Sequence, residues 1–280
     1  MKKSLLITLS LSFSMLSVIG ISQNIRNNQF FMPKEYKVLK KTVNQLARYN
    51  DLGHRPITFS IVSGSYTKWI AEELGLCKEK HCSFYEILNP YQSLNGSSSH
   101  NIQEAIRQSY LLGGVDAYSF ANGTITISKS SFLTYGNQHD FLGCTVAHEI
   151  AHFLSNDVFS NSLKVGKNSQ DLDEKDQKLL KMKVSRESEK KADAKATEMM
   201  FNSGFPADTC LKEIDFLYKI SGLGVITKPS SSHPGYEERM LSIKEVVERL
   251  MISKRSADST EGQWKYSRKN NSLIFHPISS

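Results

Sequence analysis

Most of this 280-residue sequence lacks long apolar runs, basic stripes and internal repeats. Beyond residue 21 no segment has the roughly 20 apolar residues that a membrane-spanning helix needs. The 35 Lys and Arg residues outnumber the 28 Asp and Glu residues. They do not gather in one stripe with interleaved aromatic side chains, so no nucleic-acid binding is predicted. The lack of repeats also argues against an extended repeat scaffold for binding partners.

The first 22 residues differ in composition from the rest. Lys2 and Lys3 precede an apolar, Ser-containing run from Leu5 to Ile21, with small residues at Gly20 and Ser22. This pattern is typical of a secretory signal peptide over residues 1–22. It predicts an exported protein of the periplasm or cell envelope. The alternative is an uncleaved N-terminal anchor, which would then be the point of membrane contact.

Cysteine is scarce, with four residues in the chain. Four cysteines in an exported protein predict disulfides. Cys77 and Cys82 bracket a short polar loop and form the nearest local pair, which would leave Cys144 and Cys210 to link two helices. Four cysteines permit three pairings, and the sequence does not choose among them. A metal site built on Cys77, Cys82 and His81 is the alternative for the first pair.

Hydrophobic periodicity predicts a mostly helical α+β domain with a small antiparallel sheet. Asn122-Gly123 between two alternating segments indicates a hairpin, and Asp140 is the expected N-cap of the helix that follows. Residues 165–176 are polar and are predicted to form a mobile loop, and no element is assigned to residues 253–280. The predicted helices cover residues 34–50, 67–74, 102–112, 141–154, 185–203, 207–220 and 236–251, and the predicted strands cover residues 57–62, 115–121 and 124–128.

An HExxH pentapeptide, residues 148–152, lies within the predicted helix 141–154. Four residues advance a helix by about 6 Å and slightly more than one turn, so the imidazoles of His148 and His152 project from one face. Both can then meet one zinc ion at about 2.0–2.1 Å. Glu149, beside the first ligand, can reach a zinc-bound water as a general base. The neighbouring residues are mostly apolar, unlike those of a solvated surface helix, so we predict one zinc per chain at this helix.

A catalytic zinc needs a third protein ligand. A His six residues after His152 is excluded, because that position is Val158. The remaining option is a carboxylate from the helix predicted at residues 185–203. Glu189 is favoured over Glu187, because only Glu189 has an acidic residue, Asp193, one turn later.

Three motifs occur in one order: HExxH, then Ser-Arg-Glu with Glu189 and Asp193, then Ser-x-His-Pro with His233, followed by Arg239. Together they resemble the HtpX/BepA-like zinc metallopeptidases (peptidase family M-48, gluzincins), and the similarity covers residues 115–250. The resemblance implies a zincin-like metallopeptidase domain, which we place at residues 53–252. An N-terminal helical segment at residues 23–52 would precede it, and a basic C-terminal tail at residues 253–280 would follow.

The resemblance implies further roles for residues outside the ligand set. Asp193 and Arg239 would form an ion pair that holds the helix of Glu189 in place. His233 would lie on a loop over the metal, where it either stabilises the oxyanion of the reaction or caps the zinc in a resting state. Ordinary solvated positions are the alternatives for His233 and Arg239.

In such enzymes an Asn-Ala-aromatic segment ahead of a hairpin turn forms the edge strand that pairs with substrate. The matching residues here are Asp116, Ala117 and Tyr118. Asp in place of Asn departs from the pattern, because an ionised carboxylate only accepts hydrogen bonds. Backbone pairing with a substrate would survive, since it uses main-chain groups. A plain hairpin position is the alternative for Asp116.

The function predicted from these motifs is hydrolysis of peptide bonds by a zinc endopeptidase. Zinc would acidify a water and polarise the scissile carbonyl, and Glu149 would pass the proton from water to the leaving amine. The substrates would be polypeptides, and the resemblance suggests misfolded or misassembled envelope proteins. The competing interpretation is a catalytically silent, zinc-containing chaperone or quality-control module in which His233 closes the fourth zinc position. The presence of Glu149 argues against that interpretation.

Overall fold

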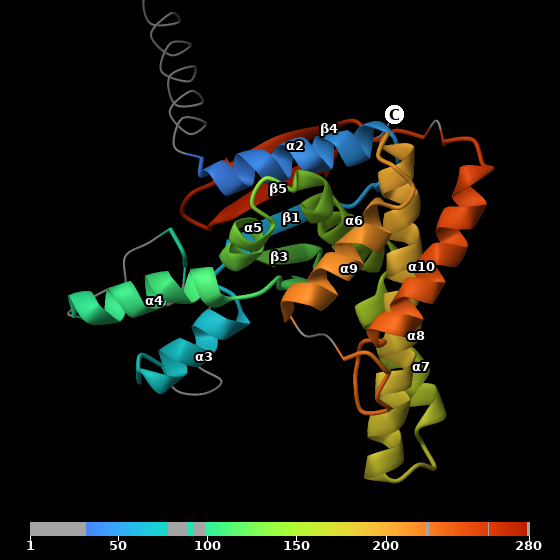
Figure 1. Ribbon diagram of the computed structural model, residues 1–280, viewed down its shortest axis with the longest axis horizontal. Coiled ribbons are helices and arrows are strands. Elements are labelled where there is room, and N and C mark those ends of the chain that lie inside the picture. The colour runs from blue at the N-terminus through green and yellow to red at the C-terminus, as the bar shows by residue number, and fades with distance from the viewer. Residues whose placement is uncertain (1–31, 78–88, 92–98, 222–223, 257, 279–280) are drawn as a thin grey trace, which may run out of the picture.

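The computed structural model describes residues 32–77, 89–91, 99–221, 224–256 and 258–278, and these form a mixed α+β fold, as predicted. In these ranges no helix is long and apolar enough to cross a membrane. The predicted signal peptide lies outside them. The helices are α2 (Lys34–Arg48), α3 (Ser65–Glu73), α4 (His100–Leu112), α5 (Lys129–Tyr135), α6 (His139–Ser155), α7 (Asp157–Asn168), α8 (Glu174–Asn202), α9 (Thr209–Ser221) and α10 (Tyr236–Met251). The strands are β1 (Ile57–Val62), β2 (Ala117–Ser119), β3 (Thr124–Ser128), β4 (Gly262–Ser267) and β5 (Ser272–Pro277) (Figure 1).

The five strands form one sheet in the order β2-β3-β1-β5-β4. The predicted β2–β3 hairpin is antiparallel, although β2 is shorter than residues 115–121. Gly123 in its turn has φ +83°, and a Cβ there would lie 3.1 Å from the carbonyl oxygen of Pro56. The sheet is mixed and not antiparallel throughout, because β1 and β3 pair in parallel while the other three strand pairs are antiparallel. A parallel pair needs a long crossover connection, which here contains α3 and α4.

The C-terminal segment, for which the sequence predicted no element, forms the β4–β5 hairpin at the other side of the sheet. Strand β5 pairs antiparallel with β1. Asn271 in the hairpin turn has φ 44° and is buried. Its amide donates to the carbonyl oxygen of Ile61, and its own carbonyl oxygen accepts hydrogen bonds from Tyr36 at 2.7 Å and Ser60 at 2.8 Å. These bonds tie the hairpin to β1 and α2.

The main core lies between the sheet and the helices α2, α6 and α8. Helix α2 buries the stripe that its periodicity predicted, since Tyr36, Leu39, Val43 and Leu46 are fully buried. The apolar HExxH helix α6 is buried along most of its length. Strands β1, β3 and β5 supply the opposite wall through their inward-facing residues, which are Ile57, Phe59, Ile61, Ile125, Ile127, Leu273 and Phe275.

Helices α6 and α8 approach each other closely at small residues. A Cβ on Gly143 would lie 2.8 Å from the Cε of Met200, so a larger residue here would displace the end of the Met200 side chain. Ala192 and Ala196 of α8 are also buried. This close packing brings the carboxylates of α8 within reach of the histidines on α6.

A disulfide joins Cys144 on α6 to Cys210 on α9. It selects one of the pairings that the sequence left open. Cys77 is also disulfide-bonded. Cys82 lies outside the described residues, so its pairing with Cys77 stays a prediction.

Replacing Cys144 and Cys210 together by Ala is expected to lower the free energy of unfolding by about 2–4 kcal/mol, because the crosslink restricts a long loop of unfolded chain. The two cysteines are 66 residues apart in sequence. Denaturant-induced unfolding of both proteins at neutral pH measures the difference. An unchanged midpoint with an unchanged slope would contradict the expected stabilisation.

Helices α7 and α8 form a projecting hairpin at the lower right of Figure 1. The prediction of a mobile loop at residues 165–176 is wrong at both ends, because α7 continues to Asn168 and α8 begins at Glu174. The carboxylate of Asp173 caps α8 by accepting a hydrogen bond from the backbone N–H of Asp176 at 2.8 Å. Ser188 of α8 donates to Asn161 of α7 at 2.9 Å. The hairpin is therefore a folded part of the domain.

The C-terminal end of α6 lies where the sequence predicted it, whereas its N-terminal cap differs from the prediction. Asn156 adopts the left-handed conformation with φ 53°, which ends the helix where the sequence predicted a stop. Asp140 is not the N-cap, because the helix begins at His139 and Gln138 holds the capping position. Asp140 lies in the first turn instead, where its charge complements the helix dipole.

Candidate metal centre

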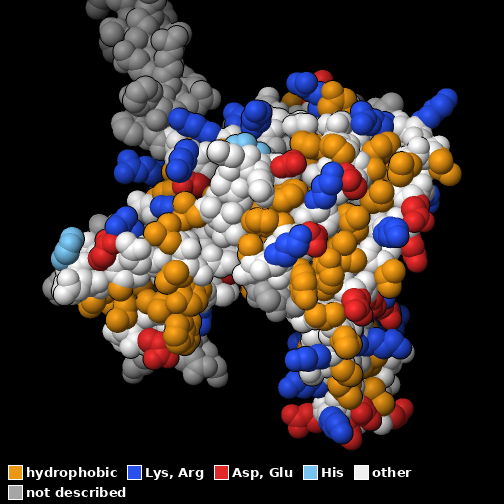
Figure 2. All heavy atoms as spheres, viewed as in Figure 1, with side chains coloured by type: hydrophobic (Ala, Val, Ile, Leu, Met, Phe, Trp, Pro, Cys, Tyr) orange, Lys and Arg blue, Asp and Glu red, His pale blue; other side chains and the backbone are white. Residues whose placement is uncertain are grey.

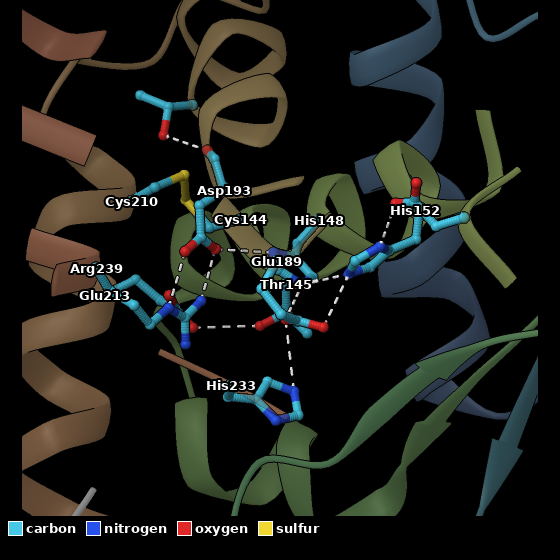
Figure 3. Close-up of polar contacts among 12 residues, drawn as sticks. Cys144, Thr145, His148, His152, Glu189, Asp193, Cys210, Glu213, His233 and Arg239 are labelled. Atoms are coloured by element: carbon cyan, nitrogen blue, oxygen red, sulfur yellow. Dashed lines mark hydrogen bonds and ion pairs between the residues drawn. A yellow bond between two sulfur atoms is a disulfide. The ribbon is translucent and has the colours of Figure 1, made fainter. Parts of the chain in front are cut away.

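The two histidines of the HExxH motif point to a common position beside α8. The Nε2 atoms of His148 and His152 lie 3.0 Å apart. Glu189 reaches across from α8, with Oε2 3.3 Å from Nε2 of His148 and Oε1 3.5 Å from Nε2 of His152 (Figure 3). The structure thus brings together the three residues that the sequence predicted as ligands.

The donor set and its spacing fit a zinc ion. Two imidazole nitrogens and one carboxylate are ligands found in catalytic zinc sites, where each donor lies about 2.0–2.2 Å from the metal. Donors at that distance in a tetrahedral arrangement lie about 3.3–3.5 Å from one another. The separations of 3.0, 3.3 and 3.5 Å here are close to that geometry. These three residues form a group that could hold a metal ion.

Both imidazoles are oriented by carboxylates on the side away from the proposed metal. Nδ1 of His148 lies 2.9 Å from Oδ1 of Asp193, and Nδ1 of His152 lies 2.7 Å from Oδ2 of Asp157. A carboxylate that accepts the Nδ1 proton leaves the lone pair of Nε2 free for a metal and makes it a stronger donor. Sequence reasoning missed Asp157. Asp157 is the first residue of α7 and follows the left-handed Asn156 directly, so it lies close to His152 in both sequence and space.

Asp193 also carries the predicted ion pair with Arg239. The guanidinium donates from Nε to Oδ2 at 2.8 Å and from Nη2 to Oδ1 at 2.6 Å. This two-bond geometry fixes the carboxylate more rigidly than a single contact would. Arg239 lies on α10, so the pair joins α10 to α8 and supports the orientation of His148.

The charges around the centre favour a cation where the three donors meet. Burial lowers the pKa of His148, but the carboxylates of Asp193 and Glu189 outweigh burial and raise that pKa well above its usual value. Burial opposes ionisation of Glu189, yet its hydrogen bonds with His148 and His152 hold its pKa far below the usual range. Against the effect of burial, Arg239 lowers the pKa of Asp193 to about 2. Both acids are therefore ionised at neutral pH.

Glu149 lies beside the centre and is 7% exposed. Within the described ranges its carboxylate makes no hydrogen bond or ion pair, so it is free to accept a proton. Burial raises the pKa of Glu149 above its usual value. A carboxylate with a raised pKa is a better proton acceptor near neutral pH than an ordinary surface acid.

Glu187, the competing third ligand, lies away from the centre. Its side chain is half exposed and is paired with Lys164 of α7. Glu189 is therefore the acid of this pair that the helix directs to the histidines.

His233 lies at the mouth of the centre, on the loop between α9 and α10. Its Nε2 is 3.5 Å from Oε2 of Glu189, and its side chain is 58% exposed. Arg186 of α8 holds this loop by donating to the carbonyl oxygens of Pro229 at 2.9 Å and Ser231 at 2.7 Å. The loop is thus anchored to the same helix that carries Glu189, while His233 keeps an exposed side chain.

A cleft of about 670 Å³ runs from the centre along the α7–α8 hairpin. Figure 2 shows that this hairpin and the α3–α4 pair project as two lobes with a hollow between them. The size is within the range of about 300–1,000 Å³ found for ligand sites. Its walls include Ala117, Tyr118, Ser119, His148, Glu149, His152, Val158, Asn161, Val165, Ser185, Glu189 and His233.

The predicted substrate segment lies at the edge of the sheet next to this cleft. Strand β2 is the edge strand and pairs only with β3 among the described strands. Tyr118 is 52% exposed and lines the cleft with Ala117. The side chain of Asp116 binds the N-terminus of α3. Its Oδ2 accepts a hydrogen bond from the backbone N–H of Ser65, the first residue of that helix, at 2.6 Å.

No protein-family model matches the chain, and comparisons with curated proteins and with solved structures found no match. The resemblance to M-48 peptidases therefore stays a prediction that rests on the motifs.

Replacing Asp157 by Asn is expected to weaken zinc binding by about 10–100-fold, because an amide accepts the Nδ1 proton of His152 less strongly than a carboxylate does. Competition with a chromophoric chelator measures the affinity. Asp171→Asn, at an exposed position between α7 and α8, is the matched control. Equal zinc affinities for the two variants would show that Asp157 does not support His152.

Proposed function

We propose that this protein is an exported zinc-dependent metalloendopeptidase with a zincin-like fold. The observation that carries the proposal is the convergence of His148, His152 and Glu189 on one point. The carboxylate of Glu149 lies beside it and has no partner among the residues that the structure describes. The order of the three motifs supports the same class through its resemblance to M-48 peptidases. Export, and a role in removing misfolded or misassembled envelope proteins, rest on the predicted signal peptide and on that resemblance.

The residues of the centre have separate tasks in this mechanism. His148, His152 and Glu189 would hold the zinc, which when bound acidifies a water and polarises the scissile carbonyl. Glu149 takes the proton from the attacking water and passes it to the leaving amine. The charge pattern supports this division, because Glu189 is ionised while burial makes Glu149 the more basic acid.

The substrate would lie along β2 as an additional strand. The outer edge of β2, which has no partner among the described strands, offers main-chain hydrogen bonds that do not depend on side-chain identity. Because the carboxylate of Asp116 is bound to the N-terminus of α3, backbone groups would make these contacts. The backbone groups of Ala117 face away from β3, because the alternate residues Asp116 and Phe120 bond to it, while Tyr118 lines the cleft with its side chain. Recognition through the main chain suits an enzyme that acts on extended polypeptides of varied sequence.

A catalytically silent zinc-binding module is the second candidate, and the place of His233 favours it. A small movement of the loop would bring Nε2 of His233, now 3.5 Å from Glu189, to the fourth zinc position. The same place also suits a group that stabilises the oxyanion. The two candidates differ in whether the zinc-loaded protein cleaves polypeptides.

Cleavage of denatured casein by the purified chain tests the proposal. We expect degradation that stops when 1,10-phenanthroline removes the metal and returns when zinc is added back, because the water and carbonyl are activated only with metal present. Fragment patterns on gels and by mass spectrometry measure it. Zinc-loaded protein that leaves casein and a panel of unfolded proteins intact would favour the silent module, and cleavage that resists the chelator would reject both.

A further inference from the structure

Glu213 of α9 is a buried acid that the proposed mechanism does not use. It is 4% exposed, and its Oε1 accepts a hydrogen bond from Oγ1 of Thr145 at 3.3 Å (Figure 3). The same oxygen accepts a hydrogen bond from the hydroxyl of Tyr135. In the part of the chain that the structure describes, no hydrogen bond or ion pair uses its second oxygen, Oε2. An unpaired carboxylate oxygen on a residue that is 4% exposed is costly, so this atom invites a ligand.

A cavity of about 130 Å³ lies next to Glu213 and continues to the metal centre. Glu149, Glu189 and His233 line both this cavity and the cleft at the metal centre. Its other walls come mainly from apolar groups, including the Cys144–Cys210 disulfide and the side chains of Val115, Ala117, Ala196, Ile214, Leu217 and Ile243. The recess thus has mainly apolar walls and, among the described residues, two acids with unpaired oxygens, Glu213 on α9 and Glu149 at the metal centre.

The size and charge of the recess define what fits it. A cavity of about 150 Å³ holds a group the size of benzene, so one side chain of moderate length can enter. Arg239 also lines the recess, but its charge is bound in two hydrogen bonds to Asp193. An apolar chain that ends in an ammonium group would bury its methylenes against the walls and donate to Oε2 of Glu213.

We propose that this recess binds a lysine side chain of the polypeptide substrate, at a residue adjacent to the scissile bond, and that Glu213 is the residue that determines this preference. This inference rests on the proposed function, because only a peptidase reaction at the metal centre would place the scissile bond beside the recess.

The titration of Glu213 adds a second, independent signature. Burial raises the pKa of Glu213 to about 7, with Asp193 acting in the same direction, while Tyr135, Arg239 and His148 oppose it. The carboxyl therefore gains negative charge as the pH rises through neutrality. An ammonium group is held more strongly by the ionised form, so the preference for lysine increases between pH 6 and pH 8.

Pairs of peptides that differ only in lysine or norleucine test the proposal, because norleucine has the same methylene chain without the ammonium group. Two pairs are needed, one with the varied residue on each side of the central peptide bond. Binding to zinc-loaded Glu149→Gln protein, in which turnover is blocked, is measured by calorimetry at pH 8. For at least one pair we expect about 10-fold tighter binding of the lysine peptide, as for a hydrogen bond to a charged group.

The variant Glu213→Gln, made in the same background, is expected to bind both peptides of that pair equally, because it keeps an acceptor for Tyr135 but loses the charge. Glu237→Gln, at an exposed position on α10, is the control and retains the preference. The protein with Glu213 intact provides a test that needs no substitution in the recess. If it bound lysine and norleucine peptides equally in both pairs, or bound no peptide, the proposal would be overturned. A preference that persists in Glu213→Gln would overturn the assignment to Glu213.

Cleavage by the active chain separates this inference from the proposed function. Tighter binding of the lysine peptide without hydrolysis of any peptide would reject the peptidase and keep the binding recess. Hydrolysis of lysine and norleucine peptides at equal rates would keep the peptidase and reject the recess as a lysine site.

Discussion

Substitution of Glu149 by Gln is expected to reduce kcat/KM for peptide hydrolysis by about 10²–10⁴-fold, because a neutral amide cannot accept the proton of the attacking water. The substitution should leave zinc binding intact, since the donors come from His148, His152 and Glu189. Hydrolysis of a quenched fluorescent peptide gives kcat/KM, and elemental analysis gives the zinc content. Loss of activity with about one zinc retained per chain is the expected pair of results.

The control for this experiment is Glu187→Gln, which makes the same chemical change on α8 at a half-exposed residue paired with Lys164. Its activity and zinc content should match those of the unaltered protein. Full activity in Glu149→Gln would mean that another group accepts the proton, and the mechanism proposed for this centre would be wrong. Simultaneous loss of zinc and activity would instead assign Glu149 a structural role.

Removal of the proposed third zinc ligand by Glu189→Ala is the second change with a large expected effect. It should lower zinc affinity by more than about 100-fold, because loss of a direct ligand costs more than loss of a group that only orients one. The change also leaves His148 and His152 without the carboxylate that faces both Nε2 atoms. Chelator competition measures the affinity, and thermal unfolding with and without zinc shows whether bound metal stabilises the fold.

Glu187→Ala is the matched control, because the two acids lie two residues apart on one helix and differ in direction. Glu187 faces Lys164, so its removal should change zinc affinity little. If Glu187→Ala weakened zinc binding more than Glu189→Ala, Glu187 and not Glu189 would be the zinc ligand from α8. If both variants bound zinc as tightly as the unaltered protein, neither acid would be a ligand.

The parts of the fold that sequence predicted well are those controlled by local chemistry. The buried stripe on α2, the end of α6 near residue 155 and the bounds of α10 all follow from periodicity and turn residues. The ligand geometry was also accessible, because an i, i+4 spacing on one helix fixes how two side chains project. Choosing Glu189 over Glu187 used the same spacing argument with Asp193.

Non-local pairing was not accessible from the sequence. Strand β3 pairs in parallel with β1 across a connection that contains two helices, and the C-terminal hairpin adds β5 to the other side of β1. Nothing in the local pattern of Gly262–Pro277 states which strand it will join. Polarity at residues 165–176 suggested a loop, but α7 and the start of α8 lie largely exposed, where polar residues are expected on helices too.

The carboxylates around the centre show the same limit. Asp157 acts on a histidine five residues away, yet it lies beyond the end of α6, so helical spacing does not predict the contact. Glu213 reaches Tyr135 from 78 residues away and lines the recess only because the disulfide and α10 hold α9 in place. Such contacts depend on tertiary packing and need a structure to be seen.

The most direct test of the account is the location of zinc in the folded protein. Anomalous diffraction at the zinc edge from crystals grown with zinc should give one strong peak per chain, about 2.0–2.2 Å from Nε2 of His148, Nε2 of His152 and a carboxylate oxygen of Glu189. A peak at other residues, or none at this site, would contradict the metal centre on which the proposed peptidase depends.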